Sequence, residues 1–249
     1  MKIKGNTILI TGGTAGIGLG FAEEFFKEGN TVIITGRRAD RLEAIAAKYP
    51  GIITKVSDVA DDAQRVELAE WVQTNYPETN IVMNNAGVQY VIDVKTPVDL
   101  VKVRSEMETN FTAPLHLSSL FVSFLQGKQD AAIINITSGL AFVPVALMPV
   151  YSASKAAMHS LCLSQRYQLK DTGIKVFEIA PPPVDTELGH DRREDKTKSH
   201  GGIPVSEFIA GSMEAIKNDV YEATIGTATG LREKREAIFE TLNAHVVLI

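Results

Sequence analysis

The sequence is poor in cysteine, and this scarcity narrows its chemistry. Its 249 residues include a single cysteine, Cys162. The chain can therefore form neither an internal disulfide nor a zinc cluster built from cysteines, and we expect no resident metal. A lone thiol fits a reducing compartment, so the expected location is the cytoplasm.

Long apolar runs and an excess of positive charge are also missing. No apolar stretch approaches the roughly 20 residues needed to cross a bilayer, and the first five residues are too short and polar to form a signal peptide. The net charge is −5, whereas a nucleic-acid partner requires a concentrated basic surface. We therefore expect neither a membrane nor a nucleic acid as a partner.

Short apolar runs instead alternate with longer amphipathic segments. Runs without in-out alternation are typical of strands covered on both faces; they span residues 6–11, 31–35, 51–59, 80–87, 131–138 and 174–181. The helical segments between them span residues 17–29, 39–49, 61–76, 97–126 and 151–172. This order predicts parallel strands joined by right-handed crossovers. The predicted fold class is α/β, a Rossmann-type doubly wound parallel sheet of about seven strands with helices on both faces.

The last seventy residues are less regular. A polar loop over 187–202 precedes a predicted helix near 204–218, a short strand near 220–226 and a terminal helix. Charges in the loop nearly cancel, so we expect no anion site there, and a surface lid beside the substrate site within about 187–218 is the simpler interpretation. Because no linker or repeat interrupts the chain, we assign residues 1–249 to one domain.

The segment TGGTAGIG, residues 11–18, leaves the first strand and enters the first helix. Gly12 permits a sharp turn, Gly16 lets a ligand approach the backbone, and Gly18 lets the helix lie close to the sheet. The helix N-terminus then offers free N–H groups to a pyrophosphate. An ordinary tight turn can also hold three glycines, but this position at the start of a doubly wound sheet favours a dinucleotide site.

The end of the second strand bears on the choice of cofactor. Sites for NAD usually carry a carboxylate there for the ribose 2′-hydroxyl, but this chain carries Arg37 and Arg38. A guanidinium can pair with a 2′-phosphate through two hydrogen bonds. We therefore predict NADP(H) in preference to NAD(H), although the arginines could simply be solvated. Asp58 and Val59 are expected at the adenine, and the NNAG turn at 84–87 beside the nucleotide.

Tyr151 and Lys155 lie four residues apart in a predicted helix, so they share a face. A free tyrosine titrates near ~10, and a nearby ammonium favours the phenolate. Ser138, at the end of the fifth strand, could hydrogen-bond the substrate oxygen while Tyr151 exchanges a proton with it. Each pattern alone arises by chance, but together behind a dinucleotide loop they indicate a catalytic site.

These motifs resemble those of the classical short-chain dehydrogenase/reductase family over essentially the whole chain, and within it the bacterial DltE-like oxidoreductases. The resemblance implies that Tyr151 is the catalytic acid and base, with Ser138 its partner on the substrate oxygen. It implies that Lys155 binds the nicotinamide ribose and that Asn110 holds a water linking Lys155 to solvent. The expected cofactor contacts are Gly12, Thr14, Ala15, Gly16, Ile17, Gly18, Arg37, Arg38, Asp58, Val59, Asn85, Ala86, Gly87, Tyr151, Lys155, Pro181, Val184 and Thr186.

The sequence departs from the family pattern at two places. Pro181 to Pro183 stand where members usually have Pro-Gly, and proline neither reaches positive φ nor supplies an N–H. The backbone near the nicotinamide is therefore stiffer than in the family, and the expected contact between Thr186 and the nicotinamide carboxamide follows less directly from the family pattern. Ala15 replaces the basic residue of many NADP-preferring loops, so Arg37 is expected to make most of the contacts with the 2′-phosphate.

The segment between Ser138 and Tyr151 is almost wholly apolar. It favours a pocket for an aliphatic or aromatic ketone, lined by Ser138, Leu140, Phe142, Val145, Leu147 and Tyr151, unless these side chains pack within the protein. The resemblance further implies a homodimer or homotetramer. The predicted function is NADP(H)-dependent interconversion of a carbonyl and a secondary alcohol. A non-catalytic NADP(H) sensor and an NAD-dependent alcohol dehydrogenase of the same family remain alternatives.

Overall fold

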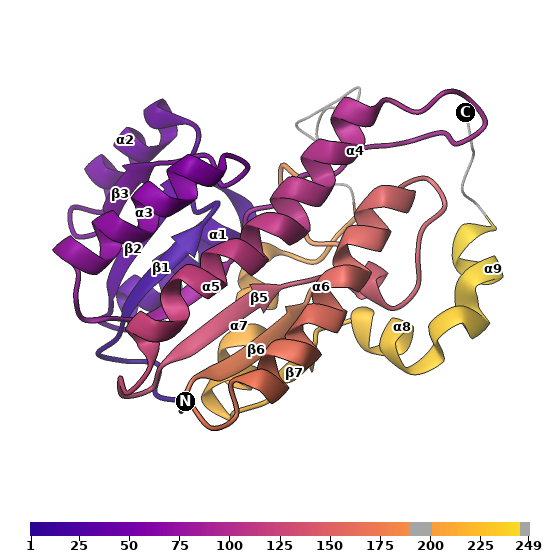
Figure 1. Cartoon of the computed structure of the whole chain (residues 1–249). Helices are drawn as coiled ribbons and strands as arrows, with labels where there is room; N and C mark the ends of the chain where they lie inside the picture. The colour runs from indigo at the N-terminus through magenta and orange to yellow at the C-terminus, as the bar shows by residue number, and fades with distance from the viewer. Residues whose placement is uncertain (190–200, 245–249) are drawn as a thin grey trace.

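A parallel sheet of seven strands forms the centre of the computed structural model, which describes residues 1–189 and 201–244 (Figure 1). The strand order is β3-β2-β1-β4-β5-β6-β7, and all neighbouring pairs are parallel. The strands are β1 Thr7–Thr11, β2 Thr31–Gly36, β3 Ile53–Val56, β4 Thr79–Asn84, β5 Ala132–Ile136, β6 Lys175–Ala180 and β7 Glu222–Thr224. The order reverses between β1 and β4, and this is where doubly wound sheets bind ligands.

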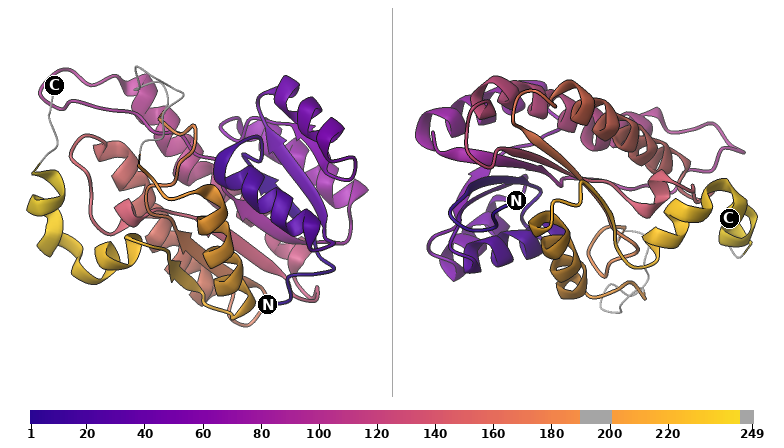
Figure 2. Two further views of the ribbon diagram at one scale, coloured as in Figure 1. Left: turned by 180° about the vertical axis from the view of Figure 1, so that it is seen from behind. Right: turned by 90° about the horizontal axis from the view of Figure 1, so that it is seen from below.

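Helices cover both faces of the sheet, which confirms the predicted fold class. They are α1 Gly16–Lys27, α2 Ala39–Lys48, α3 Asp62–Asn75, α4 Leu100–Met107, α5 Ala113–Leu125, α6 Pro149–Gln168, α7 Val205–Lys217, α8 Ala228–Lys234 and α9 Phe239–Asn243. Shorter turns are the π-helical η1 Glu108–Thr112 and the 3-10 turns η2 Gly139–Ala141 and η4 Arg235–Ile238. The view from below in Figure 2 shows α6 and α7 on opposite sides of the sheet.

Two apolar cores explain why the strands lack in-out alternation. Ile8 and Ile10 belong to the core shared with α1 and α7, whereas Leu9 belongs to the core shared with α3 and α5. Successive side chains of a strand point to opposite faces, so a strand with helices on both sides is apolar throughout. None of the described helices is long and apolar enough to span a bilayer.

The helix and the strand predicted near 204–218 and 220–226 are present as α7 and β7. In the predicted lid of 187–218, α7 instead packs against α1, with the rings of Phe21 and Phe208 edge to face at 6.1 Å, so this part forms a layer of the core. Residues 190–200 of the predicted loop lie outside the described residues.

The helices α8 and α9 extend beyond β7 and contact the segment that follows β5 (Figure 1). Phe142 and Val143 pack with side chains of these helices. The Asn243 amide accepts the Ala146 N–H at 2.7 Å and donates to the Pro144 carbonyl at 3.1 Å. The C-terminal helices therefore brace the loop between Ser138 and Tyr151.

Candidate active site

The glycine loop after β1 packs closely against the turn after β4 and against itself. Gly12 has φ +66°, and a Cβ there would lie 2.8 Å from Ala86 Cα. A Cβ on Gly18 would lie 2.3 Å from the Gly12 carbonyl oxygen. Neither position accepts a side chain, and the loop leads directly into the N-terminus of α1 at Gly16. A backbone cradle at a helix N-terminus fits the pyrophosphate of a dinucleotide.

The end of β4 is tied to this loop by the turn that follows it. Asn85 Nδ2 donates to the carbonyls of Thr11 at 2.9 Å and Gly12 at 3.0 Å. Thr11 Oγ1 accepts the backbone N–H groups of Asn85 at 3.1 Å and Ala86 at 3.2 Å. These donors hold the glycine loop in place, and the cofactor contacts expected of Asn85 and Ala86 stay predictions.

The end of β2 brings together the arginines and the carboxylate singled out in the sequence. Arg37 Nη1 lies 3.8 Å from Asp58 Oδ2, and Arg38 Nη2 donates to Thr14 Oγ1 at 3.0 Å. Asp58 Oδ1 accepts the Ala60 N–H at 2.9 Å. Two guanidinium groups therefore follow β2, and one of them contacts the glycine loop at Thr14.

Behind Val59 lies a buried arginine that sequence reasoning missed. Arg65 donates to the Val59 carbonyl and to His116 Nδ1 at 3.0 Å, and it pairs with Glu108 at 2.7 Å. It joins α3 to α5 and η1 beneath the expected adenine position. A single arginine in an ordinary amphipathic helix offers no sequence signal for this role.

Ser138 lies in the turn after β5. Its two chain neighbours form backbone hydrogen bonds, one to β6 and one to the residue that follows β6. The Thr137 N–H donates to the Ile179 carbonyl and the Gly139 N–H to the Pro181 carbonyl, both at 2.9 Å. Ser138 Oγ accepts the Leu140 N–H at 3.1 Å. The serine is mostly buried and its position is set by the sheet.

Tyr151 and Lys155 lie in the first two turns of α6, and each is only 5% exposed. Lys155 Nζ donates to the Ile136 carbonyl at 2.9 Å and lies 5.7 Å from the centroid of the Tyr151 ring. Since Ile136 ends β5, the same strand end positions both Lys155 and Ser138. The structure thus brings the predicted serine, tyrosine and lysine to one edge of the sheet.

Burial governs the protonation of Lys155. It lowers the pKa of the ammonium from 10.5 to about 8. Burial also raises the pKa of the Cys162 thiol far above its usual range, so that the thiol is neutral at pH 7 and does not offset the lysine charge.

Asn110 lies in η1, a π-helical turn between α4 and α5. Its Oδ1 accepts the Val88 N–H, and its Nδ2 donates to the Val88 carbonyl, both at 2.9 Å, and to Ser154 Oγ at 3.1 Å. A Cβ on Gly87 would lie 3.4 Å from Asn110 Oδ1 and 3.9 Å from Lys155 Nζ. The asparagine and the lysine therefore flank the same glycine, and π turns often occur at functional sites.

A family model described as short chain dehydrogenase matches residues 6–197, which is most of the chain. The protein belongs to the short-chain dehydrogenase family. It is accordingly an oxidoreductase that uses a nicotinamide dinucleotide and acts on a small molecule, as the resemblance implied.

Comparisons with individual proteins support this family assignment. It is 44% identical over 243 residues to the uncharacterized oxidoreductase DltE of Bacillus subtilis, covering 97% of this chain and 96% of that protein. It is 35% identical over 186 residues to a serine 3-dehydrogenase of Agrobacterium fabrum, covering 73% of each. A short chain dehydrogenase from Burkholderia cenocepacia, solved in complex with NADP, aligns over 100% of both chains with a TM-score of 0.80 and 25% identity.

A second solved structure shows the shared fold alone. It is a short chain dehydrogenase/reductase from Burkholderia phymatum in complex with NAD, with a TM-score of 0.84 and 19% identity over 100% of this chain and 99% of that one.

The apolar residues predicted for the substrate side of this dehydrogenase fall into two groups. Phe142 is only 4% exposed and packs with Leu231 and other residues of the C-terminal segment. Leu140, Val145 and Leu147 are half-buried and stay candidates for the pocket wall. The Leu147 carbonyl accepts the Ile92 N–H at 3.2 Å, which joins this wall to the segment after β4.

The segment after β6 runs beside the glycine loop. A Cβ on Gly16 would lie 3.0 Å from Thr186 Cβ. Val184 forms an isolated parallel bridge with Ile203. Thr186 therefore lies against the glycine loop, and the cofactor contacts expected of Pro181, Val184 and Thr186 stay predictions.

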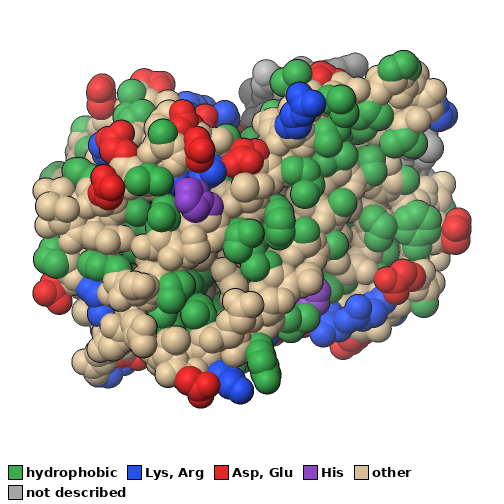
Figure 3. Space-filling model, in the orientation of Figure 1, with side chains coloured by type: hydrophobic (Ala, Val, Ile, Leu, Met, Phe, Trp, Pro, Cys, Tyr) green, Lys and Arg blue, Asp and Glu red, His purple; other side chains and the backbone are tan. Residues whose placement is uncertain are grey.

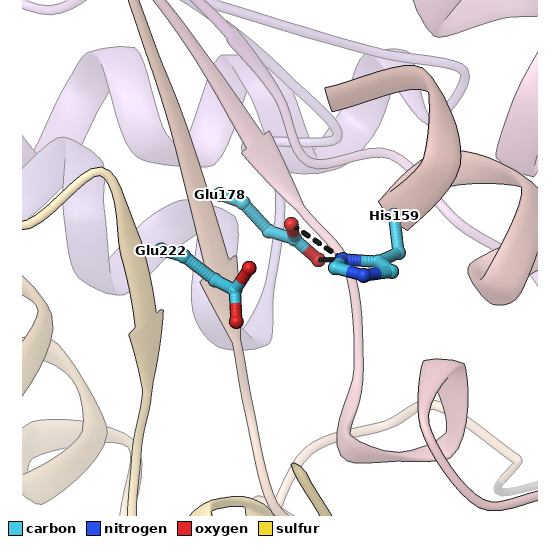
Figure 4. Close-up of side chains that lie close together, drawn as sticks. All are labelled: His159, Glu178 and Glu222. Carbon is cyan, nitrogen blue, oxygen red and sulfur yellow. Dashed lines mark hydrogen bonds and ion pairs between the residues drawn. The ribbon is translucent and has the colours of Figure 1, made fainter. Parts of the chain in front are cut away.

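A histidine of α6 and two glutamates, one of β6 and one of β7, lie close together (Figure 4). His159 Nδ1 lies 2.9 Å from Glu178 Oε2, and Thr137 Oγ1 donates to Glu178 Oε1 at 2.9 Å. Glu222 pairs with Arg232 Nε at 2.5 Å. Both carboxylates therefore have protein partners, and the cluster links β6 and β7 to α6 and α8.

Proposed function

We propose that this short-chain dehydrogenase interconverts a ketone and a secondary alcohol with NADP(H), on a small hydrophobic substrate. The proposal rests above all on the buried Lys155 ammonium, which the end of β5 holds beside Tyr151. Ser138 follows the same strand end, so three polar groups meet where parallel sheets bind ligands.

The roles follow from the donors and acceptors. Ser138 and Tyr151 hydrogen-bond the carbonyl oxygen of the substrate, and a nicotinamide dinucleotide held by the glycine loop would supply the hydride. Tyr151 donates its phenolic proton to the oxygen as negative charge develops there. Lys155 then stabilises the phenolate electrostatically. In the alcohol direction Tyr151 accepts the hydroxyl proton.

Asn110 positions the wall of the site. Both atoms of its side-chain amide bond the backbone of Val88, which follows the NNAG turn. The role implied by the resemblance, holding a water next to Lys155, is compatible with its place beside Gly87. The arrangement of all four residues favours an enzyme over a nucleotide sensor.

The arginines at the end of β2 support NADP(H). Arg37 and Arg38 stand where NAD sites usually hold a carboxylate, and the solved relative from Burkholderia cenocepacia was obtained with NADP. Asp58 lies near Arg37, and another structural neighbour was solved with NAD, which makes an NAD-dependent enzyme of the same family the competing candidate.

Binding and turnover test these assignments separately. NADPH and NADH are titrated by quenching of tryptophan fluorescence, and aliphatic and aromatic ketones are then compared with keto acids and serine as substrates. We expect tighter binding of NADPH and higher kcat/KM on hydrophobic ketones. Tighter NADH binding would reject the cofactor assignment, and faster turnover of serine or keto acids would reject the substrate assignment.

We further propose a homo-oligomer that acts in the cytoplasm. On the long helices α5 and α6, Phe121 and Met158 are core residues, but Leu115 and Leu163 are 39% and 47% exposed. Figure 3 shows apolar side chains along this face of the molecule. Sedimentation of the wild type against Leu163→Glu tests the proposal, since the charge would weaken an interface there.

A further inference from the structure

Glu187 contacts two arginines that lie about 150 residues earlier in the chain. Its carboxylate accepts from Arg38 Nη1 at 3.0 Å and from Arg41 Nη1 at 2.6 Å and 2.7 Å. Arg38 precedes α2 and Arg41 lies in its first turn, whereas Glu187 follows β6. The contact therefore joins the segment after β6 to the start of α2.

This contact adjoins the glycine loop. Arg38 uses its other terminal nitrogen, Nη2, to donate to Thr14 Oγ1. Thr186, next to Glu187, lies against Gly16. Glu187 thus reaches guanidinium groups at the place where, on the proposed function, the 2′-phosphate of NADP(H) would bind.

The charges explain why the carboxylate is held there. Burial by itself would raise the pKa of Glu187, but hydrogen bonds from Arg41 and Arg38 outweigh it and hold the pKa below its ordinary value. Three arginines lie close to two carboxylates here. Arg38 and Arg41 pair with Glu187, and Arg37 lies near Asp58. A carboxylate and a phosphate use the same guanidinium donors, so the two anions compete for them.

We propose that Glu187 is a specificity-determining residue that competes with the 2′-phosphate for Arg38 and Arg41. It satisfies both arginines when no 2′-phosphate is bound and is displaced when one binds. Glu187 thereby weakens binding of 2′-phosphorylated ligands without affecting others. The inference rests on the proposed NADP(H) site.

Two nucleotides that differ only in the 2′-phosphate provide the test. Adenosine 2′,5′-bisphosphate and adenosine 5′-monophosphate are titrated calorimetrically into the wild type, Glu187→Gln and the control Glu43→Gln. Glu43 is an exposed residue of α2, so the control removes the same charge from the neighbourhood. Exposed ion pairs are individually weak, so we expect Glu187→Gln to bind the bisphosphate about five-fold more tightly. Its binding of the monophosphate should stay within about two-fold, as should both affinities of Glu43→Gln.

A double-mutant cycle identifies the partners. In an Arg38→Met/Arg41→Met background, Glu187→Gln should leave bisphosphate affinity unchanged, because the arginines for which the anions compete are gone. The inference is overturned if Glu187→Gln leaves bisphosphate affinity unchanged in the wild-type background, changes both nucleotides equally, or matches Glu43→Gln.

The proposed cofactor preference is tested by a different measurement, on the wild type alone. It is wrong if NADH binds more tightly than NADPH. The bisphosphate-to-monophosphate ratio of Glu187→Gln still decides the inference in that case. Melting temperatures of all variants show whether each is folded under the conditions of titration.

Discussion

Lys155 Nζ lies 5.7 Å from the centroid of the Tyr151 ring and is held there by the Ile136 carbonyl at 2.9 Å. The two side chains are one helical turn apart and both are buried. The hydrogen bond crosses from α6 to the end of β5, so the sheet fixes the distance between the cation and the phenol.

Replacing Tyr151 with phenylalanine removes the proposed proton donor and little volume. We expect Tyr151→Phe to lower kcat by about 10²- to 10⁴-fold, the usual contribution of general acid–base catalysis, with the NADPH dissociation constant nearly unchanged. Tyr167→Phe, on an exposed part of the same helix, is the control and should keep full activity. Unimpaired turnover by Tyr151→Phe would refute the mechanism.

We expect the buried Lys155 to lower the free energy of unfolding although the proposed activity requires it. A pKa lowered from 10.5 to about 8 in the folded state corresponds to about 3 kcal/mol of destabilisation at pH 7. Lys155→Met removes this penalty but leaves the Ile136 carbonyl without its lysine donor, so we expect a net gain of about 1–2 kcal/mol at pH 7 together with loss of activity.

The pH dependence of unfolding checks this account. Between pH 8 and 10.5 the unfolded lysine binds a proton that the folded lysine has released, so stability of the wild type should rise with pH across this window. Lys155→Met lacks this contribution, and its advantage should vanish by about pH 10.5. Urea titrations that show a constant difference from pH 7 to 10.5 would contradict the prediction.

Gly18 should tolerate no side chain. A Cβ there would lie 2.3 Å from both the Gly12 carbonyl oxygen and Asn85 Nδ2, so Gly18→Ala must displace the glycine loop. We expect a destabilisation of about 1–3 kcal/mol and weaker NADPH binding. Gly230→Ala is the matched control: nothing lies within 4 Å of its Cβ, and alanine in α8 should add up to about 1 kcal/mol. Equal effects of the two substitutions on urea unfolding would exclude the steric argument.

His159 should stabilise the buried charge of Glu178. His159→Leu removes the hydrogen-bond partner at 2.9 Å from a carboxylate that is fully buried, and leaving a buried acceptor without its partner costs about 1–3 kcal/mol. The double variant His159→Leu/Glu178→Gln removes the charge too and should recover part of the loss. If urea unfolding shows the double variant to be less stable than the single one, charge compensation is not the role of His159.

The sequence predicted the sheet and the grouping of Ser138, Tyr151 and Lys155 at one edge of it, because both depend on local patterns. Buried strands read as apolar runs, and Tyr151 and Lys155 share a face through helical spacing alone. Arg65 and the contact between Glu187 and Arg41 could not be predicted, since they join distant segments that show no periodicity. Phe142 shows a further limit: an apolar side chain in a loop looks the same whether it lines a pocket or packs against other helices.

The π turn around Asn110 means that the long segment from α4 to α5 contains one residue more in that turn than a regular helix would. Deleting a single residue there would restore uniform α-helical hydrogen bonding and yet rotate the amide away from Val88. Local helical regularity and the architecture of the active site therefore place opposite demands on this segment, and the native chain keeps the less regular backbone.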